Sequence, residues 1–296
     1  MKAQLLESIA QLRDRMARSR RAGLSVGLVP TMGALHAGHA RLIEHARQDC
    51  ECVVVSIFVN PLQFDREEDL NRYPRTLEAD LEMCAAHGVD VVFAPAVSEM
   101  YPSPPSCVVE VGRIADYLCG QHRPGHFLGV ATVVMKLFQI VQPDRAYFGE
   151  KDAQQLAIIR HLVRDFNVPV SIEAIATVRD SDGLALSSRN QRLDQGEREL
   201  ARSLYRALSE ARQQISRGVK DAAEVKRTAG AQVPRDDRLR FEYLEIVDPE
   251  DMQPVEPIEG PVLVAGALWV GSTRLIDNLL CSPPASPPRG PADVTK

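Results

Sequence analysis

The sequence Pro30-Thr31-Met32-Gly33-Ala34-Leu35-His36-Ala37-Gly38-His39 decides how this chain is interpreted. It follows an apolar run at residues 26–29, which predicts a buried strand, and precedes residues 41–46, which predict a helix. A strand, a tight glycine-containing turn and a helix start favour phosphate binding, because free N–H groups and the positive end of the helix dipole face outward there. If the helix has begun, the spacing of His36 and His39 places both rings on one side.

Other phosphate and metal motifs fit this turn poorly. Only Gly33 and Gly38 lie in it, so it is not a GxGxxG dinucleotide motif, and no Gly-Lys-Ser/Thr follows as in a P-loop. A His-x-x-His pair could bind zinc, but no Cys, Asp or third His lies close by in sequence to complete the ligands. A purely structural helix cap remains an alternative. We favour recognition of a nucleotide phosphate by backbone N–H groups and imidazole donors.

Strands and helices alternate along the first part of the chain. Residues 52–59 form a near-continuous β-branched run, as expected of a parallel strand covered on both faces. The charged residues 65–73 are expected to form a loop. Further strands are predicted at residues 89–93, 145–148 and 168–177, and helices at residues 2–20, 75–87, 129–141 and 153–166. The alternation predicts an α/β fold with a doubly wound parallel sheet over the first ~175 residues.

The pattern changes after Val178, which divides the chain into two predicted domains. A polar, turn-rich stretch follows, then two helices, two strands and a short third strand, which indicate a small α+β domain. The helices are expected at residues 196–216 and 221–232, and the strands at 239–247, 261–270 and 273–278. We assign residues 1–178 to the parallel-sheet domain and 179–283 to the small domain. The proline-rich residues 284–296 are expected to be disordered.

Composition limits the possible partners and compartment. A formal net charge of −5 argues against a general nucleic-acid binder, although it allows a small anionic substrate in a locally basic pocket. The six cysteines include no CxxC pair, which favours free thiols and a reducing cytoplasm. The N-terminus lacks an apolar signal core, and no run of 18 apolar residues occurs, so we expect no membrane span.

Four unusual polar clusters fall where a doubly wound sheet binds its ligand. Ligands of such sheets lie where the carboxyl ends of the strands meet the helix starts. Residues 30–39, 60–64 and 149–152 each follow a predicted strand, and residues 123–126 precede a predicted helix. Their coincidence predicts one shared pocket.

Lys151 lies at a predicted helix start, where a cation is unfavourable unless an anion is bound nearby. It could therefore contact a polyphosphate, although a solvated lysine is the alternative. Asp152 could cap the same helix or accept a hydrogen bond from a ribose hydroxyl.

Neutral amides and a polar loop supply the remaining candidates. Asn60, Gln63 and Gln155 can both donate and accept, which suits a polyol or hydroxy acid, although each could be an ordinary surface residue. Ser187 and Arg189 lie in a loop at the domain junction, where they could close over phosphates, or form a solvated turn. No Ser-His-Asp set, activated cysteine or carboxylate pair is recognisable. A donor-rich, base-poor site favours nucleotidyl transfer.

These motifs resemble those of the pantoate–β-alanine ligase family within the nucleotidylyltransferase superfamily, whose fold is Rossmann-like. Residues 30–39 resemble its HIGH-type motif, and Leu186-Ser187-Ser188-Arg189-Asn190 resembles its KMSKS-type motif. The combination with residues 56–64, 123–127 and 149–156 is similar to this one family, and the similarity runs from about residue 1 to residue 280. Leu186 departs from the family pattern, in which methionine is common.

The resemblance implies an ATP-dependent condensation of pantoate with β-alanine through a pantoyl adenylate, with magnesium accompanying ATP, in a cytoplasmic homodimer. It implies that His36, His39, Lys151 and Arg189 act in catalysis, with His39 as proton donor. The implied ATP-binding residues are Met32, Gly33, Ala34, Leu35, His36, Ala37, Gly38, His39, Gly149, Glu150, Lys151, Asp152, Val178, Leu186, Ser187, Ser188 and Arg189. The implied pantoate and β-alanine site contains Gln63, Gln155, Asn60, Tyr73, Arg123 and His126.

Three other functions remain as alternatives. A simple nucleotidylyltransferase would use a phosphate-bearing acceptor and need extra cations, whereas this acceptor loop offers Asn60 and Gln63. A tRNA-charging enzyme conflicts with the acidic charge and the lack of an appended basic domain. A non-catalytic nucleotide-binding module would not need both histidines and Lys151.

Overall fold

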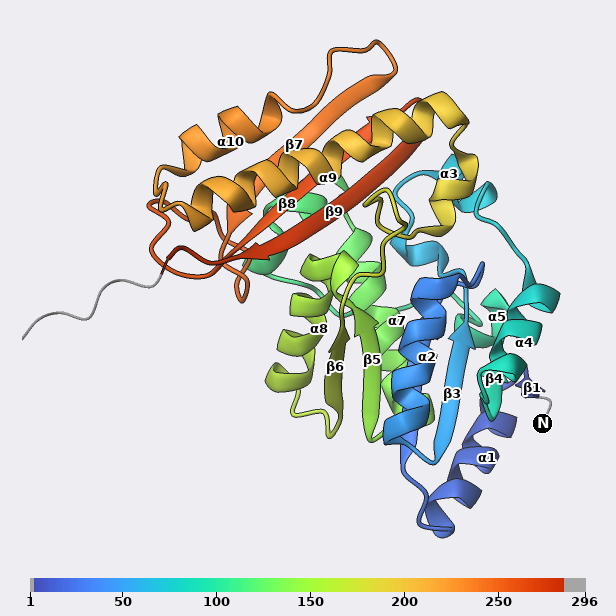
Figure 1. Cartoon of the computed structure of the whole chain (residues 1–296). Helices are drawn as coiled ribbons and strands as arrows, with labels where there is room; N and C mark the ends of the chain where they lie inside the picture. The colour runs from blue at the N-terminus through green and yellow to red at the C-terminus, as the bar shows by residue number, and fades with distance from the viewer. Residues whose placement is uncertain (1–2, 285–296) are drawn as a thin grey trace, which may run out of the picture.

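A computed structural model describes residues 3–284 of the chain (Figure 1). The predicted disordered segment, residues 284–296, lies outside the described residues except for its first residue. The described chain forms a six-stranded parallel sheet with helices on both faces and a separate three-stranded antiparallel sheet. This confirms the predicted α/β fold with a smaller α+β unit.

The parallel sheet has the strand order β1-β4-β3-β2-β5-β6. Its strands are β1 (Gln4–Leu6), β2 (Val26–Thr31), β3 (Cys52–Ile57), β4 (Val91–Phe93), β5 (Arg145–Gly149) and β6 (Ser171–Ile175). From β2 the chain steps outward through β3 to β4 on one side, and later continues through β5 to β6 on the other. The strand order therefore reverses between β2 and β5, which opens a crevice at their carboxyl ends.

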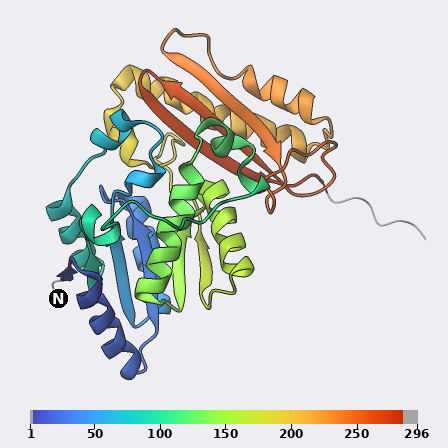
Figure 2. The same cartoon turned by 180° about the vertical axis from the view of Figure 1, so that it is seen from behind.

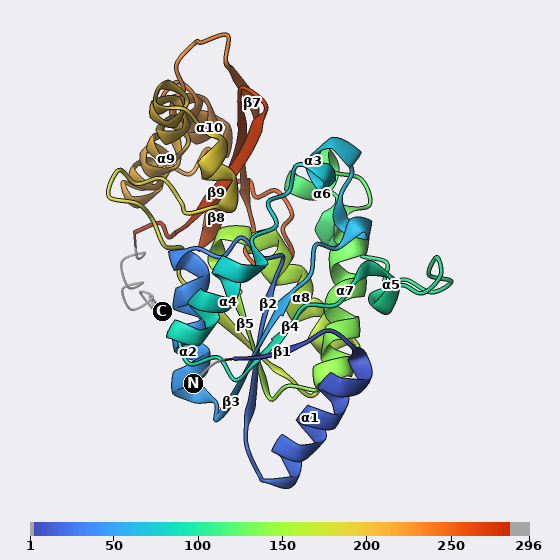
Figure 3. The same ribbon diagram turned by 90° about the vertical axis from the view of Figure 1, so that its right-hand side faces the viewer.

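Helices cover both faces of this sheet (Figure 3). Leu28 and Val54 face the helices α1 (Ile9–Arg21), α7 (His126–Val141) and α8 (Ala153–Asp165), because they share one hydrophobic cluster with them. Val29 and Val55, the next residues along the strands, share another cluster with α2 (Ala37–Asp49) and α4 (Leu77–Ala86). Because helices cover both faces of β2 and β3, the sequences of these two strands are almost continuously apolar.

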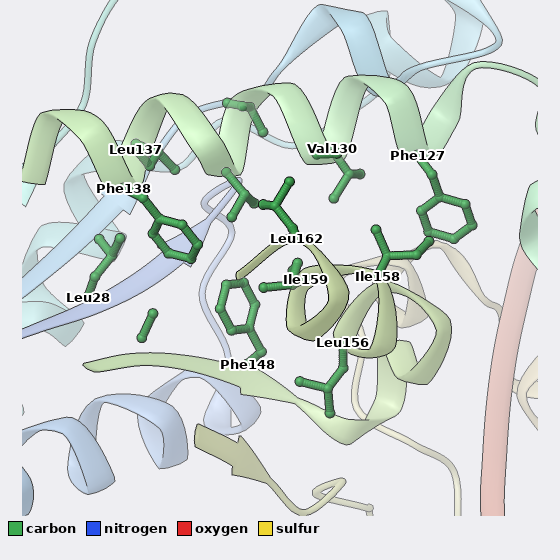
Figure 4. Packing of buried hydrophobic residues seen from close by; sticks show 14 of the residues in the cluster. Leu28, Phe127, Val130, Leu137, Phe138, Phe148, Leu156, Ile158, Ile159 and Leu162 are labelled. Carbon is green, nitrogen blue, oxygen red and sulfur yellow. The ribbon is translucent and has the colours of Figure 1, made fainter. Parts of the chain in front are cut away.

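Short helices fill the connections. They are α3 (Glu67–Asn71), α5 (Val97–Met100), α6 (Leu118–His122) and the 3₁₀ turns η1 (Pro61–Gln63), η2 (Arg113–Ala115), η3 (Glu150–Asp152) and η4 (Ser188–Arg192). Figure 4 shows how α7 packs: its apolar side chains point toward β2, β5 and α8. The labelled residues of this contact are Leu28, Phe127, Val130, Leu137, Phe138, Phe148, Leu156, Ile158, Ile159 and Leu162.

The smaller sheet joins β7 (Leu239–Val247), β8 (Val262–Val270) and β9 (Thr273–Cys281), with α9 (Gln195–Ser216) and α10 (Ala222–Gly230) on one face. Val264 and Leu268 pack in the cluster of α9 and α10, whereas Leu263 and Ala265 belong to the main cluster of the parallel-sheet unit. The segment containing α6 lies against this sheet (Figure 2), and Cys119 Sγ is 3.3 Å from Tyr243 Oη. Both faces of the small sheet are thus buried.

Three predicted elements differ from the structure. Residues 4–6, expected within a helix, form β1 and pair with β4, and α1 begins after Ser8, whose side chain accepts from the Gln11 N–H. Residues 65–73, expected as a loop, contain α3. The third strand of the small sheet is nine residues long rather than short, because β9 pairs along the whole of β8. Pairing with strands that are distant or extended, β4 for β1 and β8 for β9, accounts for the two strand differences but not for α3.

Gly129 allows α7 to approach the loop after β3 closely. A Cβ at this position would lie 2.3 Å from the carbonyl oxygen of Leu62, inside the van der Waals limit. The Asn60 side chain also donates to the Gly129 carbonyl across 3.0 Å. The absence of a side chain at Gly129 therefore sets the position of residues 60–64 against α7.

Gly129→Ala should lower the free energy of unfolding by about 1–3 kcal/mol, because helix and loop must move apart. Urea unfolding followed by circular dichroism measures this change. Gly230→Ala is the matched control: this glycine is also helical, but a Cβ there would meet nothing within 4 Å. Equal stability of the two variants would contradict the close-packing argument.

Candidate active site

A cavity of about 1470 Å³, part of it open to solvent, lies at the carboxyl ends of β2, β3 and β5. It brings together all four predicted polar clusters and the loop from the small domain. Predicted site residues that line it are Met32, His36, Gly38, His39, Gln63, Tyr73, Arg123, His126, Gly149, Lys151, Asp152, Gln155, Val178, Leu186, Ser187, Ser188 and Arg189. Predicted site residues that are not among its lining are Gly33, Ala34, Leu35, Ala37, Asn60 and Glu150.

The two imidazoles cap the start of α2. His36 Nδ1 accepts from the Gly38 N–H at 3.1 Å, and His39 Nδ1 accepts from the His36 N–H at 3.2 Å. The ring centroids are 4.2 Å apart. Because each Nδ1 is an acceptor, each neutral ring carries its proton on Nε2. The rings therefore act as helix caps, and this capping leaves the Nε2–H group of each ring available as a donor.

Burial keeps both rings uncharged. It lowers the pKa of His36 to about 4, and the neighbouring Lys151 ammonium lowers it as well. Burial also lowers the pKa of His39 to about 3, with a further contribution from His36. At neutral pH both residues are thus hydrogen-bond donors rather than imidazolium acids. His36, His39 and Lys151 all line this same cavity.

Asp80, which the sequence analysis did not identify, shapes the turn before α2. This buried carboxylate accepts from the backbone N–H groups of Ala34 at 3.0 Å and Leu35 at 2.8 Å. Gly33 and Ala34 both have left-handed backbone, with φ of 81° and 50°. Asp80 shares a helix face with the buried Cys84, four residues on, which was the available signal.

This contact corrects one prediction about the turn. We expected its free N–H groups to face a phosphate, but those of Ala34 and Leu35 are bonded to Asp80, and that of Gly38 is bonded to His36. The Asp80 carboxylate accepts from the N–H groups of Ala34 and Leu35, because a turn folded this tightly buries those groups away from any ligand. The imidazole Nε2 groups stay available as donors at this edge of the cavity.

Asn60 supports Gln63 from behind. Asn60 is 1% exposed, and its Nδ2 donates to Gln63 Oε1 at 3.1 Å. Tyr101 Oη in turn donates to Asn60 Oδ1 at 3.0 Å. Gln63 Nε2 points toward Met32 Sδ at 3.0 Å and lines the cavity. The structure thus separates two amides that look alike in sequence: Gln63 reaches the cavity, and Asn60 orients it.

Arg123 and His126 hold the backbone of the same residue. Arg123 Nη2 donates to the Gln63 carbonyl at 3.2 Å, and His126 Nδ1 donates to it at 2.7 Å. His126 Nε2 then accepts from Arg123 Nη1 at 3.1 Å, which defines its tautomer. Burial, followed by the Arg123 charge, lowers the pKa of His126 to about 3. Asp65 accepts from Arg123 Nε at 2.9 Å and completes the network.

Lys151 extends into the cavity from η3. Its side chain is 20% exposed, and Nζ lies 3.7 Å from Asp152 Oδ1. The carbonyl of Lys151 accepts from Asn278 Nδ2 at 2.9 Å, so β9 of the small domain fixes this turn. Asp152 lies at the N-cap position of α8, but its side chain makes no capping bond, so the capping alternative is met in position only. Gln155 lines the cavity one turn further on.

Residues 186–189, called the lid segment here, line the cavity. Ser187 Oγ accepts from the Arg189 N–H at 3.2 Å, which shapes the turn. Ser188 Oγ is 3.4 Å from Tyr73 Oη, and Arg189 Nη2 lies 2.8 Å from Asp69 Oδ2. Burial raises the pKa of Tyr73. The lid segment therefore rests on residues of the parallel-sheet domain.

Residues 3–284 offer neither a cluster of metal ligands nor a membrane-spanning helix. This part of the chain contains no group of three or more His, Cys, Asp or Glu side chains placed to hold a metal ion. None of its helices combines the length and the apolar character needed to cross a membrane.

The partly buried, uncharged His126 makes stability depend on pH. With a folded pKa of about 3 and an unfolded value of 6.5, the unfolded chain binds more protons between these limits, so stability falls as pH drops below 6.5. His126→Asn keeps a donor near the Gln63 carbonyl but cannot titrate. Its unfolding free energy should therefore fall less steeply between pH 6 and pH 5 than that of the parent, by up to about 1.4 kcal/mol per pH unit. An equal fall in the unfolding free energy of the two proteins would contradict this assignment.

Solved structures resemble this chain over nearly its full length. The crystal structure of pantothenate synthetase from Thermus thermophilus has a TM-score of 0.89 and 45% identity, and the match covers 95% of this chain and 100% of that one. Pantoate-β-alanine ligase from Francisella tularensis, complexed with β,γ-ATP and β-alanine, has a TM-score of 0.78 and 35% identity, with 94% and 97% covered.

Sequence comparisons point to the same family. The chain is 52% identical over 277 residues to pantothenate synthetase of Moorella thermoacetica, which covers 94% of this chain and 98% of that protein. Some curated relatives are longer, and the chain spans about half the length of bifunctional pantoate ligase/cytidylate kinases. The family model for pantoate-β-alanine ligase matches residues 4–280. This chain belongs to the pantoate–β-alanine ligase family.

Proposed function

We propose that this chain condenses (R)-pantoate with β-alanine to give pantothenate, and that ATP is converted to AMP and diphosphate through a pantoyl adenylate. One observation carries the proposal: a single cavity holds two neutral imidazole donors, a lysine and two amides beneath an arginine-bearing segment. These are groups that bind polyphosphate and a hydroxy acid without acting as strong bases.

In the first step a pantoate carboxylate oxygen attacks the α-phosphorus of ATP, and the bond from that phosphorus to the bridging oxygen breaks. Charge accumulates on the α-phosphate and on the departing diphosphate. Lys151, Arg189 and the Nε2–H groups of His36 and His39 are the donors available to stabilise it. Because neutral imidazoles donate without losing their protons, His39 serves in this proposal as a hydrogen-bond donor to the phosphates.

In the second step the amine of β-alanine attacks the acyl carbon, and the bond from that carbon to the phosphate oxygen breaks. AMP then leaves, and one amine proton is released to solvent. Gln63 and Gln155 line the cavity, and their amides are proposed to hold the hydroxyl groups of pantoate. Asn60, Arg123 and His126 support Gln63 through the contacts described above. An acyl adenylate hydrolyses readily, so the lid segment must exclude water until the amine arrives.

The remaining nucleotide contacts are assigned by position. Met32, Gly38, Gly149, Asp152 and Val178 line the cavity near the imidazoles and are proposed to contact ATP. Gly33, Ala34, Leu35, Ala37 and Glu150 are proposed to act through their backbone, by maintaining the turns that carry these residues. We also keep the division into a nucleotide- and pantoate-binding domain, residues 1–178, and a lid domain, residues 179–283.

Magnesium is proposed to enter with ATP. Mg²⁺ usually binds one or two carboxylates, several waters and the substrate phosphates, and the Asp152 carboxylate is exposed in the cavity beside Lys151. The family resemblance further leads us to propose a homodimer in the cytoplasm. Small molecules, rather than a nucleic acid or membrane, are the proposed partners, consistent with a net charge of −5.

The direct test supplies the protein with ATP, Mg²⁺ and pantoate, with and without β-alanine. Diphosphate should appear only when pantoate is present, and pantothenate and AMP should accumulate in equal amounts once β-alanine is added. Mass spectrometry identifies the products. Diphosphate release that ignores pantoate, or the absence of any pantothenate, would refute the proposed reaction.

Lys151→Met should lower the rate of pantoate-dependent diphosphate release by about 10²–10³-fold, because the substitution keeps much of the length of the side chain and removes its charge. Lys220→Met is the control, since Lys220 is exposed and outside the cavity. Stopped-flow detection of diphosphate gives the rate. A Lys151 variant with the parent rate would remove this lysine from the mechanism.

A further inference from the structure

Residues 65–73, called the strap here, belong to the parallel-sheet domain but contact the small domain at several points. The Arg66 guanidinium lies 5.4 Å from the Trp269 ring centroid, and the Arg72 carbonyl accepts from Arg192 Nη2 at 3.0 Å. Tyr73, at the end of the strap, reaches the lid segment. Asp69 makes the strongest contact, in the middle of the strap.

Asp69 binds two arginines of the small domain with one carboxylate. Oδ2 lies 2.8 Å from Arg189 Nη2, and Oδ1 lies 3.1 Å from Arg192 Nη1. The three side chains are each about a quarter exposed, so water screens the contact only in part. Asp69 is desolvated by burial, but the two guanidinium groups prevail and lower its pKa, so it is charged at neutral pH.

A carboxylate between two guanidinium groups occupies the kind of position that a phosphate group can take. The fork of N–H donors in arginine matches carboxylate and phosphate oxygens equally well. Arg189 also lines the cavity, and Lys151 and His36 line the same cavity. One guanidinium therefore has two anions within its range: the internal carboxylate and the phosphates of the proposed substrate.

We propose that Asp69 is a positioning residue that holds Arg189 at the mouth of the cavity and yields it to the triphosphate of ATP. ATP binding then competes with an internal anion, and the strap secures the lid segment through Arg192 and Tyr73 once Arg189 has moved. The proposal rests on the proposed function, since it assumes that Arg189 contacts phosphate.

The other end of the strap strengthens the argument. Asp65 binds Arg123, and Arg123 donates to the carbonyl of Gln63, the residue proposed to contact pantoate. A single segment of nine residues thus contacts both the proposed pantoate site and the arginine proposed to bind ATP. A movement of the strap would therefore shift both the proposed pantoate site and the arginine proposed to bind ATP.

Two roles of Asp69 lead to different kinetic results: it could be a purely structural contact, or an anion that competes with ATP for Arg189. Loss of a structural contact would raise KM for ATP and lower kcat together, because the lid segment would be poorly placed. Loss of a competing anion should lower KM for ATP, because Arg189 is already free. It should also loosen the lid segment, so that water reaches the adenylate more often and AMP forms without pantothenate.

The experiment compares Asp69→Asn with Asp69→Glu and with the control Glu67→Gln. Glu67 carries the same charge on the same short helix, is exposed and has no ion-pair partner among the described residues, so it reports the effect of charge alone. Asp69→Asn should lower KM for ATP by about three- to tenfold. It should also raise the ratio of AMP to pantothenate above that of the parent. Asp69→Glu and Glu67→Gln should stay near the parent in both readouts.

An unchanged or higher KM for ATP in Asp69→Asn would overturn the inference, as would the same decrease in Glu67→Gln. A lower KM without a higher AMP ratio would refute the part that concerns the strap. Failure of the proposed function is recognised separately, because the parent protein would then release no diphosphate in response to pantoate.

Discussion

The crevice between β2 and β5 is the constraint on which the rest of the molecule depends. Parallel strands leave their carboxyl ends at one edge of the sheet, and the connections after β2 and β5 diverge to opposite faces there. The turn at residues 30–39 and the turn at residues 149–152 are therefore brought together, while the helices that follow them cover opposite faces of the sheet. The remaining segments that line the cavity are added around these two turns.

Desolvation decides the electrostatic character of the cavity. His36 and His39 would both titrate near neutral pH in water, but burial keeps them uncharged and limits the fixed positive charge to Lys151, Arg189 and Arg123. Arg123 is already engaged by Asp65, and Arg189 by Asp69. A site of this kind orients its ligands and stabilises developing charge, and it holds little capacity to remove protons.

The small domain contributes to the site through packing as well as through the lid segment. Its three-stranded sheet is buried on both faces, so it is attached to the parallel-sheet domain by a hydrophobic contact and not only by the linker. Asn278 of β9 fixes the backbone of Lys151 from this sheet. In the proposed function, a movement of the lid segment would therefore be local, because the sheet behind it is anchored.

The sequence by itself determined the class of fold, the order of most elements and the clusters of polar residues at the strand ends, because hydrophobic periodicity and turn residues are local signals. It also indicated the superfamily through the motifs at residues 30–39 and 186–190, and the family through their combination with residues 56–64, 123–127 and 149–156. Only the tertiary structure decided which polar side chains face the cavity: Gln63 rather than Asn60, since that direction depends on contacts with distant elements such as α7. Asp80 and Asp69 escaped the sequence analysis for the same reason, because their partners lie 45 and 120 residues away along the chain.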